Sequence, residues 1–274
     1  MKKATVLSAE VFLLCLMFFA GSVQGEQPLI ISNEGGIPLI LSAPHGGRLE
    51  IPGGVLRKGD GVDQFTTVRD VGVDIMALAL ADRFEAITGK RPFLVVAQFS
   101  RKYADVNREE SDAVEDESSR RVYRSYHAAL QIYCEQVQRR WGKGWLLDIH
   151  GQSVDSNAVF RGTSSGKSIQ HFLKEQGAAA MTGPDGFQTE LESAGWKIIP
   201  PLSQPELDRR TGFGVETKFN GGHITRTYAG LSWMDAMQFE FGSRYSSRGR
   251  MTNTVEVLAA VWVKHFLAPS NGGR

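Results

Sequence analysis

The segment Trp145-Leu-Leu-Asp148-Ile-His150-Gly151 is an apolar run that ends in a histidine and a glycine. A short apolar run of this kind is typical of a strand buried at the centre of a sheet. Asp148 and His150 are two residues apart, so their side chains lie on the same side of an extended strand. One of them could bind a metal ion while the other orients a ligand or a substrate from behind it.

A second histidine follows another apolar run, in Ser42-Ala-Pro-His45-Gly-Gly-Arg-Leu-Glu50. Open α/β sheets bind ligands at the ends of their strands, and two glycines let the backbone turn and approach a ligand closely. If the two strands are neighbours, His45 and His150 can reach one metal ion. Two histidines and one carboxylate, with a position left for water, form a known catalytic zinc site. Glu50 could fold back to supply the carboxylate.

Strand patterns alternate with helical patterns along the chain, which predicts a single α/β domain. The helical patterns cover Asp70–Thr88, Ser119–Trp141, Ser168–Glu175 and Thr252–Phe266. The strand patterns cover Leu29–Ile31, Pro38–Ser42, Phe93–Phe99, Trp145–Ile149, Trp196–Ile199 and Gln238–Phe241. Residues 200–222 are rich in proline, glycine and charge, and we expect them to form a long surface loop over a site.

A third polar group, Arg101-Lys-Tyr-Ala-Asp105-Val-Asn107-Arg108, also follows an apolar strand pattern. Arg101 and Arg108 could hold a substrate carboxylate through paired hydrogen bonds. Asn107 could position that carboxylate or a carbonyl group, and Asp105 could hold one arginine in place. A cluster of ion pairs at the surface is the alternative interpretation.

Glu240 lies between two phenylalanines in Gln238-Phe-Glu240-Phe-Gly242. A buried carboxylate is costly unless it has a partner or a role. Burial raises the pKa of a carboxyl group, which suits a general base that takes a proton from water. A buried salt bridge with Arg244 or another arginine is the alternative. The nearby segment Gly221-Gly-His223-Ile-Thr-Arg226 adds His223 and Arg226 as candidate substrate-binding residues.

The segment Gly162-Thr-Ser164-Ser-Gly166-Lys167-Ser168 resembles two short motifs. A phosphate-binding loop would need glycine at the position of Arg161. The Gly-x-Ser-x-Gly pattern of serine hydrolases is present around Ser164. However, the apolar run before it covers only Ala158 to Phe160 and is broken off by Arg161. We expect a flexible polar loop before a helix.

The first 25 residues have the pattern of a secretory signal peptide. Lys2 and Lys3 precede an apolar run of ten residues, Val11 to Ala20, and small residues follow. A mature membrane-spanning helix needs about 20 apolar residues, so an uncleaved anchor is the weaker alternative. We therefore predict a mature domain of residues 26–274 that is secreted or periplasmic and has no stable membrane anchor.

The composition excludes several classes of protein. The chain has 274 residues, of which 42% are hydrophobic and 22% charged, as in ordinary globular proteins. A formal net charge of +1 argues against a protein that coats nucleic acid. Two cysteines are too few for a disulfide scaffold, and Cys15 lies in the predicted signal peptide. We expect Cys134 to be a small buried apolar residue.

The motifs, taken in their order, resemble those of the N-formylglutamate amidohydrolase family. The resemblance spans residues 38 to 245, and its elements are SAPHGG at Ser42–Gly47, ADVNR ending at Arg108, YHAAL at Tyr126–Leu130, DIHG at Asp148–Gly151 and QFEFG at Gln238–Gly242. It implies a fold similar to that of the zinc carboxypeptidases and other phosphorylase/hydrolase-like proteins. That fold is a single α/β domain with a mixed, mostly parallel sheet flanked by helices.

The resemblance implies one zinc ion held by His45, His150 and a carboxylate. The related phage poly-γ-glutamate hydrolases have a His-Gly-Gly stretch with a glutamate five residues on, which favours Glu50. Asp70, at the start of the next helix, also matches a recurrent acid of the family and is the alternative ligand.

The resemblance also implies that Glu240 is the general base and that Arg108 and Asn107 hold a substrate carboxylate or carbonyl. The expected activity is zinc-dependent hydrolysis of an amide bond next to a carboxylate, in an N-acyl amino acid, a peptide or a γ-glutamyl substrate. Enzymes that act on formylglutamate in histidine breakdown are cytoplasmic, so an exported protein points to another substrate. A non-catalytic extracellular protein that binds carboxylates or peptides is the alternative function.

Overall fold

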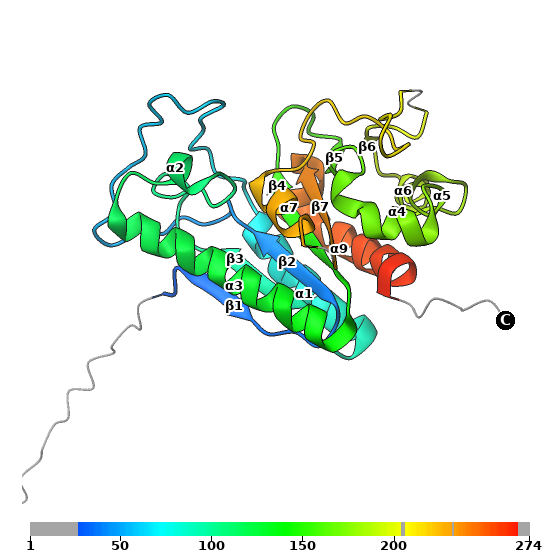
Figure 1. Ribbon diagram of the computed structural model, residues 1–274, viewed down its shortest axis with the longest axis horizontal. Coiled ribbons are helices and arrows are strands. Elements are labelled where there is room, and N and C mark those ends of the chain that lie inside the picture. Colours follow the sequence, from blue (N-terminus) through cyan, green and yellow to red (C-terminus); the bar gives the residue numbers. More distant parts are fainter. Residues whose placement is uncertain (1–26, 204–205, 232, 268–274) are drawn as a thin grey trace, which may run out of the picture.

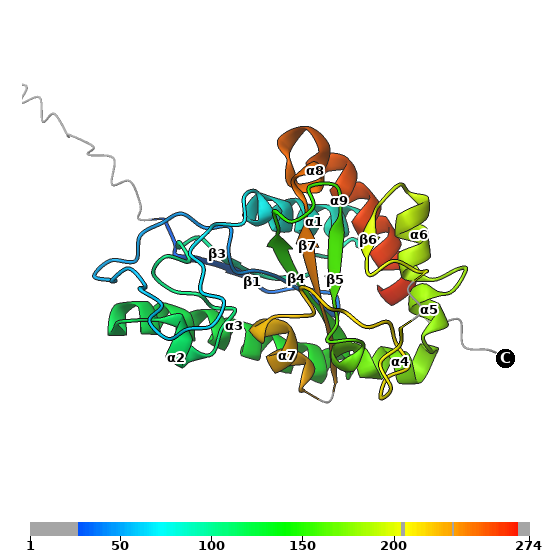
Figure 2. The ribbon, with the colours of Figure 1, turned by 90° about the horizontal axis from the view of Figure 1, so that it is seen from above.

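The computed structural model describes residues 27–203, 206–231 and 233–267, and the predicted signal peptide lies outside them. The described residues form one mixed sheet with helices against both faces (Figures 1 and 2). This confirms the expected fold class. Across the sheet the strand order is β1 (Ile30–Asn33), β3 (Phe93–Ala97), β2 (Leu39–Ala43), β4 (Gly144–Gly151), β7 (Met234–Phe241), β5 (Val159–Gly162) and β6 (Ile198–Ile199).

The long helices lie where the sequence predicted them, as α1 (Val73–Thr88), α3 (Glu117–Trp141) and α9 (Arg248–Trp262). α1 and α9 cover one face of the sheet, and α3 and α7 (His223–Ala229) cover the other, as Figure 2 shows. The remaining helical segments are α2 (Glu110–Ala113), η1 (Lys167–Ile169), α4 (Gln170–Gln176), α5 (Ala179–Thr182), α6 (Phe187–Ser193), α8 (Ser243–Ser246) and η2 (Val263–Leu267).

The centre of the sheet is parallel. β3, β2, β4 and β7 run in one direction, while β1 at one edge pairs antiparallel with β3, and β5 pairs antiparallel with β7 and parallel with the edge strand β6. The carboxyl ends of β2, β4 and β7 therefore lie side by side, along what we call the carboxyl edge of the sheet. Ligands bind outside the carboxyl ends of parallel strands in open α/β sheets, so the fold itself indicates this edge as the site.

The alternation of β4 explains which side chains reach that edge. Trp145, Leu147 and Ile149 belong to the core beneath α1 and α9, whereas Leu146 belongs to the core beneath α3. Successive side chains of a strand point to opposite faces, so Asp148 and His150 lie on the α3 side with Leu146. Two polar residues at the end of an apolar strand thus point into the same side of the sheet.

The start of α1 differs from the expectation and bears on the site. The predicted helix included Asp70, but α1 begins at Val73, after Gly72 with φ of 86°. Asp70 instead lies in the preceding loop, where its backbone N–H donates to the carbonyl of His45 at 3.1 Å. This contact turns the Asp70 side chain toward the strand ends instead of placing it on a helix surface.

The strand β5 was not expected, because Arg161 interrupts its apolar run. In the structure Arg161 is 2% exposed and its Nε donates to Glu216 Oε1 at 3.2 Å. Its guanidinium group also lies 4.4 Å from the ring centre of Phe213. A charged residue can occupy this buried strand because its charge is paired there.

Glu216 explains the near-match to a phosphate-binding loop. Its carboxylate accepts hydrogen bonds from the backbone N–H groups of Thr163 and Ser165, at 2.6 and 2.9 Å, and from the Thr163 hydroxyl at 2.6 Å. Ser164 and Ser165 have φ of 52° and 54°, and in this turn the N–H groups of Thr163 and Ser165 point to the same carboxylate oxygen. The turn is therefore an anion-binding loop that is filled by the chain's own carboxylate, and not the flexible loop that we expected.

Two further expectations concern the membrane and the cysteine. Within residues 27–203, 206–231 and 233–267, no helix has both the length and the apolar character required to cross a membrane.

Cys134 is a buried free thiol on α3. Burial raises the pKa of this thiol to about 12, so it is an apolar core residue and a poor nucleophile.

The pair of Arg161 and Glu216 gives a test of the fold. We expect Arg161→Met and Glu216→Leu each to lower the free energy of unfolding by about 3–5 kcal/mol, because each leaves a buried charge without its partner. The double variant should lose less than the sum of the two single losses. Chemical denaturation followed by circular dichroism measures all three. Additive losses would contradict the pairing. Lys197→Met removes an exposed ion pair with Asp155 and is the control, so it should change the free energy of unfolding little.

Candidate metal centre

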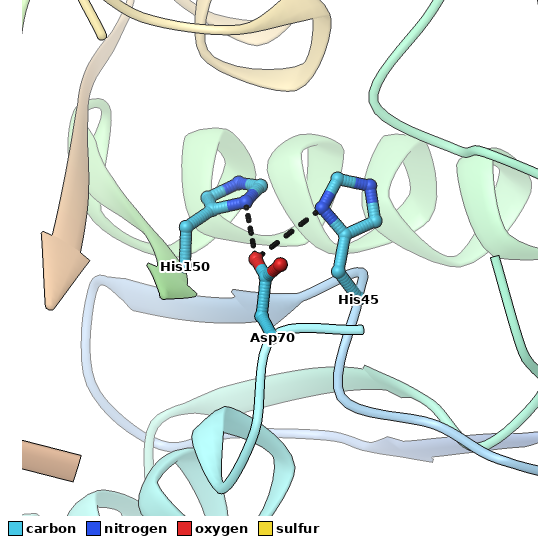
Figure 3. Close-up of side chains that lie close together, drawn as sticks. All are labelled: His45, Asp70 and His150. Atoms are coloured by element: carbon cyan, nitrogen blue, oxygen red, sulfur yellow. Dashed lines mark ion pairs between the residues drawn. The ribbon is translucent and has the colours of Figure 1, made fainter. Parts of the chain in front are cut away.

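Three buried side chains converge at the carboxyl edge of the sheet: His45, Asp70 and His150. One ligand atom from each lies within 4.8 Å of the other two. Figure 3 shows the two rings on either side of the carboxylate, with the Nδ1 atoms of His45 and His150 at 3.5 and 3.3 Å from Asp70 Oδ2. Two imidazole nitrogens and one carboxylate oxygen are a donor set that binds zinc in proteins.

Neighbouring segments bring these residues together. β2 and β4 are adjacent, so the rings of His45 and His150 have centres 4.9 Å apart. Asp70 is fixed between them, since its backbone N–H donates to the His45 carbonyl and its Oδ2 accepts from Gly151 N at 3.1 Å. A Cβ at Gly46 would lie 2.5 Å from Asp74 Cβ, so only glycine lets the start of α1 approach this closely.

Each histidine is held from behind by a second carboxylate. His45 Nε2 is 2.7 Å from Asp105 Oδ1, and His150 Nε2 is 2.8 Å from Asp148 Oδ2. An ionised carboxylate only accepts hydrogen bonds, so Nε2 of each ring is the donor, and Nδ1 of the neutral ring keeps its lone pair. That lone pair faces Asp70 in both rings. A carboxylate behind a histidine is the usual support of a metal ligand.

Two further observations fit a cation at this point. The Nδ1 atom of His45 is buried and has no hydrogen-bond partner in the described structure, although it faces Asp70. Burial alone would raise the pKa of Asp70, but the close approach of His150 and His45 outweighs it and holds that pKa well below its usual range. Burial would lower the pKa of His150, yet Asp148, Asp70 and Glu240 raise it. The surrounding carboxylates thus favour a positive charge among the three residues.

Glu50, the favoured carboxylate ligand, lies away from this group, and this corrects the expectation. Its side chain is exposed and lines a separate hollow with Leu29 and Pro52. The physical reason is the path of the chain after Gly47, where the N–H groups of residues 48 and 49 donate to the carbonyl of Gln98. That path follows the end of β3, on the side of β2 opposite to β4. Asp70, the alternative, occupies the place between the histidines.

Glu240 lies directly beside the metal group. It pairs in register with His150 across β4 and β7, and it is 7% exposed. Burial, together with the charges of Asp70 and Asp148, raises the pKa of Glu240 to about 8. Its Oε1 accepts from Gln238 Nε2 at 2.9 Å. No ion pair joins Glu240 to Arg244 or any other arginine in the described residues, so the salt-bridge interpretation is not what the structure shows.

The arginines expected to clamp a substrate are instead bound to Asp105. Arg101 Nη2 donates to Asp105 Oδ2 at 2.6 Å, and Arg108 Nε donates to the same oxygen at 3.2 Å. Arg101 also donates to the Val68 carbonyl at 3.2 Å, and Arg108 to the Asp63 carbonyl at 2.8 Å. Asp105 was expected to hold an arginine. That it also holds His45 was not predicted, because the two residues are 60 positions apart and no spacing rule joins them.

Asn107 connects the metal group to α7. Its Oδ1 accepts from Ile224 N at 2.8 Å, and its Nδ2 lies 3.3 Å from His150 Nε2. Since that nitrogen donates to Asp148, it cannot also accept from Asn107, so the amide hydrogens stay available to a ligand. A Cβ at Gly222 would lie 2.1 Å from Asn107 Nδ2, so a larger residue there would displace the Asn107 amide group.

A single cavity of about 680 Å³ contains these groups. His223 also lines it and pairs through Nδ1 with Glu109 at 3.2 Å. Ser164 is not among its lining residues, and the Ser164 hydroxyl is buried without a hydrogen-bond partner in the described structure. A serine nucleophile with a histidine base is therefore not assembled. The residues at the cavity that bear on the chemistry are His45, Asp70, Arg101, Asp105, Asn107, Arg108, His150, His223, Arg226, Gln238 and Glu240.

Comparison with known proteins identifies the fold. No protein-family model and no curated protein matches the chain. The N-formylglutamate amidohydrolase of Ralstonia eutropha JMP134 matches with a TM-score of 0.53 and 17% identity, over 86% of this chain and 96% of that one. A gene product of Agrobacterium tumefaciens matches with a TM-score of 0.56 and 14% identity, over 87% and 95% of the two chains. The chain thus has the fold of an N-formylglutamate amidohydrolase structure.

The choice between the two carboxylates can be tested by metal binding. We expect Asp70→Ala and His150→Ala each to lose bound zinc, because each removes one of three donors. Glu50→Ala is the matched control and should keep the zinc content of the unaltered protein. Plasma mass spectrometry of protein dialysed against zinc gives the content, and competition with a chelator gives the affinity. Zinc retained by Asp70→Ala but lost by Glu50→Ala would overturn the assignment.

Proposed function

We propose that the protein is a zinc-dependent hydrolase that cleaves an amide bond next to a carboxylate. The observation that carries the proposal is the pairing of two features in one cavity. A His-Asp-His group with a carboxylate behind each imidazole lies beside Glu240, a buried acid with no ion pair in the described structure. His150 of the metal-binding group pairs in register with Glu240 across the neighbouring strands β4 and β7.

The donor set favours zinc and leaves room for catalysis. His45, Asp70 and His150 would hold the ion through two nitrogens and one oxygen, which is the number of protein ligands in catalytic zinc sites. When bound, zinc would polarise a substrate carbonyl group and lower the pKa of water. Asp105 and Asp148 keep the Nδ1 atoms of the two histidines directed at this point.

Glu240 has the properties of the proton carrier. A base that works near neutral pH needs a pKa close to that pH, and burial raises the pKa of Glu240 to about 8. In the proposed reaction, Glu240 takes a proton from the attacking water and returns it to the leaving amine. Gln238 holds one carboxylate oxygen of Glu240, so the other oxygen remains available for the proton. The amide of Asn107 can donate a hydrogen bond to the substrate carbonyl oxygen.

The substrate class follows from the cavity and from the fold. The structural neighbour from Ralstonia eutropha is an N-formylglutamate amidohydrolase, which supports hydrolysis of an amide in an acidic substrate. A cavity of about 680 Å³ is in the range of sites that bind ligands of drug size, so it has room for a larger acyl group. We propose an N-acyl amino acid, a peptide or a γ-glutamyl compound outside the cytoplasm, given the signal-peptide pattern of residues 1–25.

The proposal predicts a loss of turnover that is separate from a loss of metal. Zinc-loaded protein should hydrolyse members of a panel of N-acyl amino acids and γ-glutamyl peptides, and chelation should abolish the activity. We expect Glu240→Gln to lower kcat by about 10²–10⁴-fold, because a general base contributes a factor of that size. Its zinc content should stay unchanged, and Glu50→Gln, at an exposed position outside the cavity, should keep full activity.

Equal turnover by the unaltered protein and by His150→Ala would exclude the metal mechanism. Tight binding of carboxylates or peptides by a zinc-free protein that turns over no member of the panel would support the non-catalytic binding protein instead. Activity that resists a chelator but is lost in Ser164→Ala would indicate a serine hydrolase.

A further inference from the structure

The arginines that line the cavity differ in their partners. Arg101 and Arg108 both donate to Asp105, and each also donates to a backbone carbonyl. Arg226 lines the same cavity and is exposed. Its Nη1 donates to the carbonyl oxygen of Gly221, and no carboxylate of the described residues pairs with it. Arg226 therefore keeps most of its five N–H donors for a ligand.

The backbone that carries Arg226 is fixed to the reacting groups. Gly222 N donates to Gln238 Oε1 at 2.6 Å, and Gln238 holds Glu240 through its other amide atom. Arg226 N then donates to the Gly222 carbonyl at 3.1 Å, within the first turn of α7. Three hydrogen bonds in succession thus connect the proposed base to the backbone of Arg226. The segment that carries Arg226 is therefore fixed in position relative to Glu240.

On the α7 side of the cavity, the positive charge of Arg226 has no paired carboxylate among the described residues. His223, the nearest titratable residue on α7, is paired with Glu109 and not with Arg226. Apart from Asp70, Asp105 and Glu240, the carboxylates that line the cavity are Asp63 and Asp112. The Asp63 carbonyl accepts from Arg108 and the Asp112 carbonyl from Arg57, so both acids belong to the opposite, Asp105-bound side.

We propose that Arg226 binds the carboxylate of the substrate, and that Arg101 and Arg108 hold Asp105 instead of the substrate. The inference rests on the proposed function and names the residue that selects its acidic substrates. The substrate would be an amide with a free carboxylate that reaches the first turn of α7. An amide whose carboxylate is replaced by a neutral carboxamide would lose the paired hydrogen bonds of the guanidinium group.

Steady-state kinetics with matched substrates test the proposal. The substrates are an N-acyl amino acid that the zinc-loaded protein cleaves and the same compound with a carboxamide in place of the carboxylate. We expect Arg226→Gln to raise KM for the acid about 10- to 100-fold and to leave kcat within a few-fold, because a charged hydrogen-bond partner is removed from binding. The preference for acid over carboxamide should disappear, and Arg226→Lys should restore part of it. Arg139→Gln, at an exposed site on α3, is the control and should behave like the unaltered protein.

A binding measurement separates this proposal from the proposed reaction. Isothermal titration of zinc-loaded protein with glutarate and with glutaramide needs no turnover. We expect Arg226→Gln to weaken glutarate about 10- to 100-fold, to leave glutaramide unchanged and to keep the zinc content. Weakened glutarate binding without hydrolysis of any substrate would keep the carboxylate site and remove the amidase function. Equal glutarate affinity in the two proteins, or an acid preference retained by Arg226→Gln, would overturn the role of Arg226.

Discussion

The buried carboxylate of Asp105 is the interaction on which the cavity depends. It accepts from His45 Nε2 at 2.7 Å and from Arg101 and Arg108 at 2.6 and 3.2 Å, and Arg57 Nη1 lies 3.6 Å from it. Burial would raise the pKa of Asp105, but His45 and the arginines hold it well below its usual range. One fixed negative charge therefore sets the orientation of a metal-binding ring and neutralises arginines that would otherwise repel a cation.

The strands that carry the site could be predicted from the sequence, because each is a short apolar run that ends in a polar residue. His45 and His150 each follow an apolar run, and parallel neighbours bring such ends together whatever the loops do. Glu240 stood out because an acid between two buried phenylalanines needs a role. The third ligand could not be chosen in this way. The path from Gly47 to Asp70 depends on hydrogen bonds to distant segments, and the spacing of residues along the sequence does not reveal such bonds.

The missed strand β5 has the same cause. Arg161 breaks an apolar pattern, and its partner Glu216 is 55 residues away. Sequence spacing cannot show that a distant carboxylate will be buried with it. The turn from Thr163 to Ser165 resembled an anion site for a sound reason, since its N–H groups do bind an anion. The anion belongs to the chain itself, and it fixes the segment that continues into Gly221 and α7.

The Arg161–Glu216 pair and the cavity differ in whether their charged groups have partners within the protein. In the Arg161 system every charge has its opposite within the protein, so it can only contribute structure. In the cavity, Glu240 has no cationic partner among the described residues, Arg226 has no anionic one, and His45 Nδ1 has no hydrogen-bond partner. Leaving a buried acid without a cation and a buried nitrogen without a hydrogen bond costs stability, and such costs are characteristic of sites that bind their partners from solution. A cation at the histidines and an amide with a carboxylate toward α7 would satisfy all three at once.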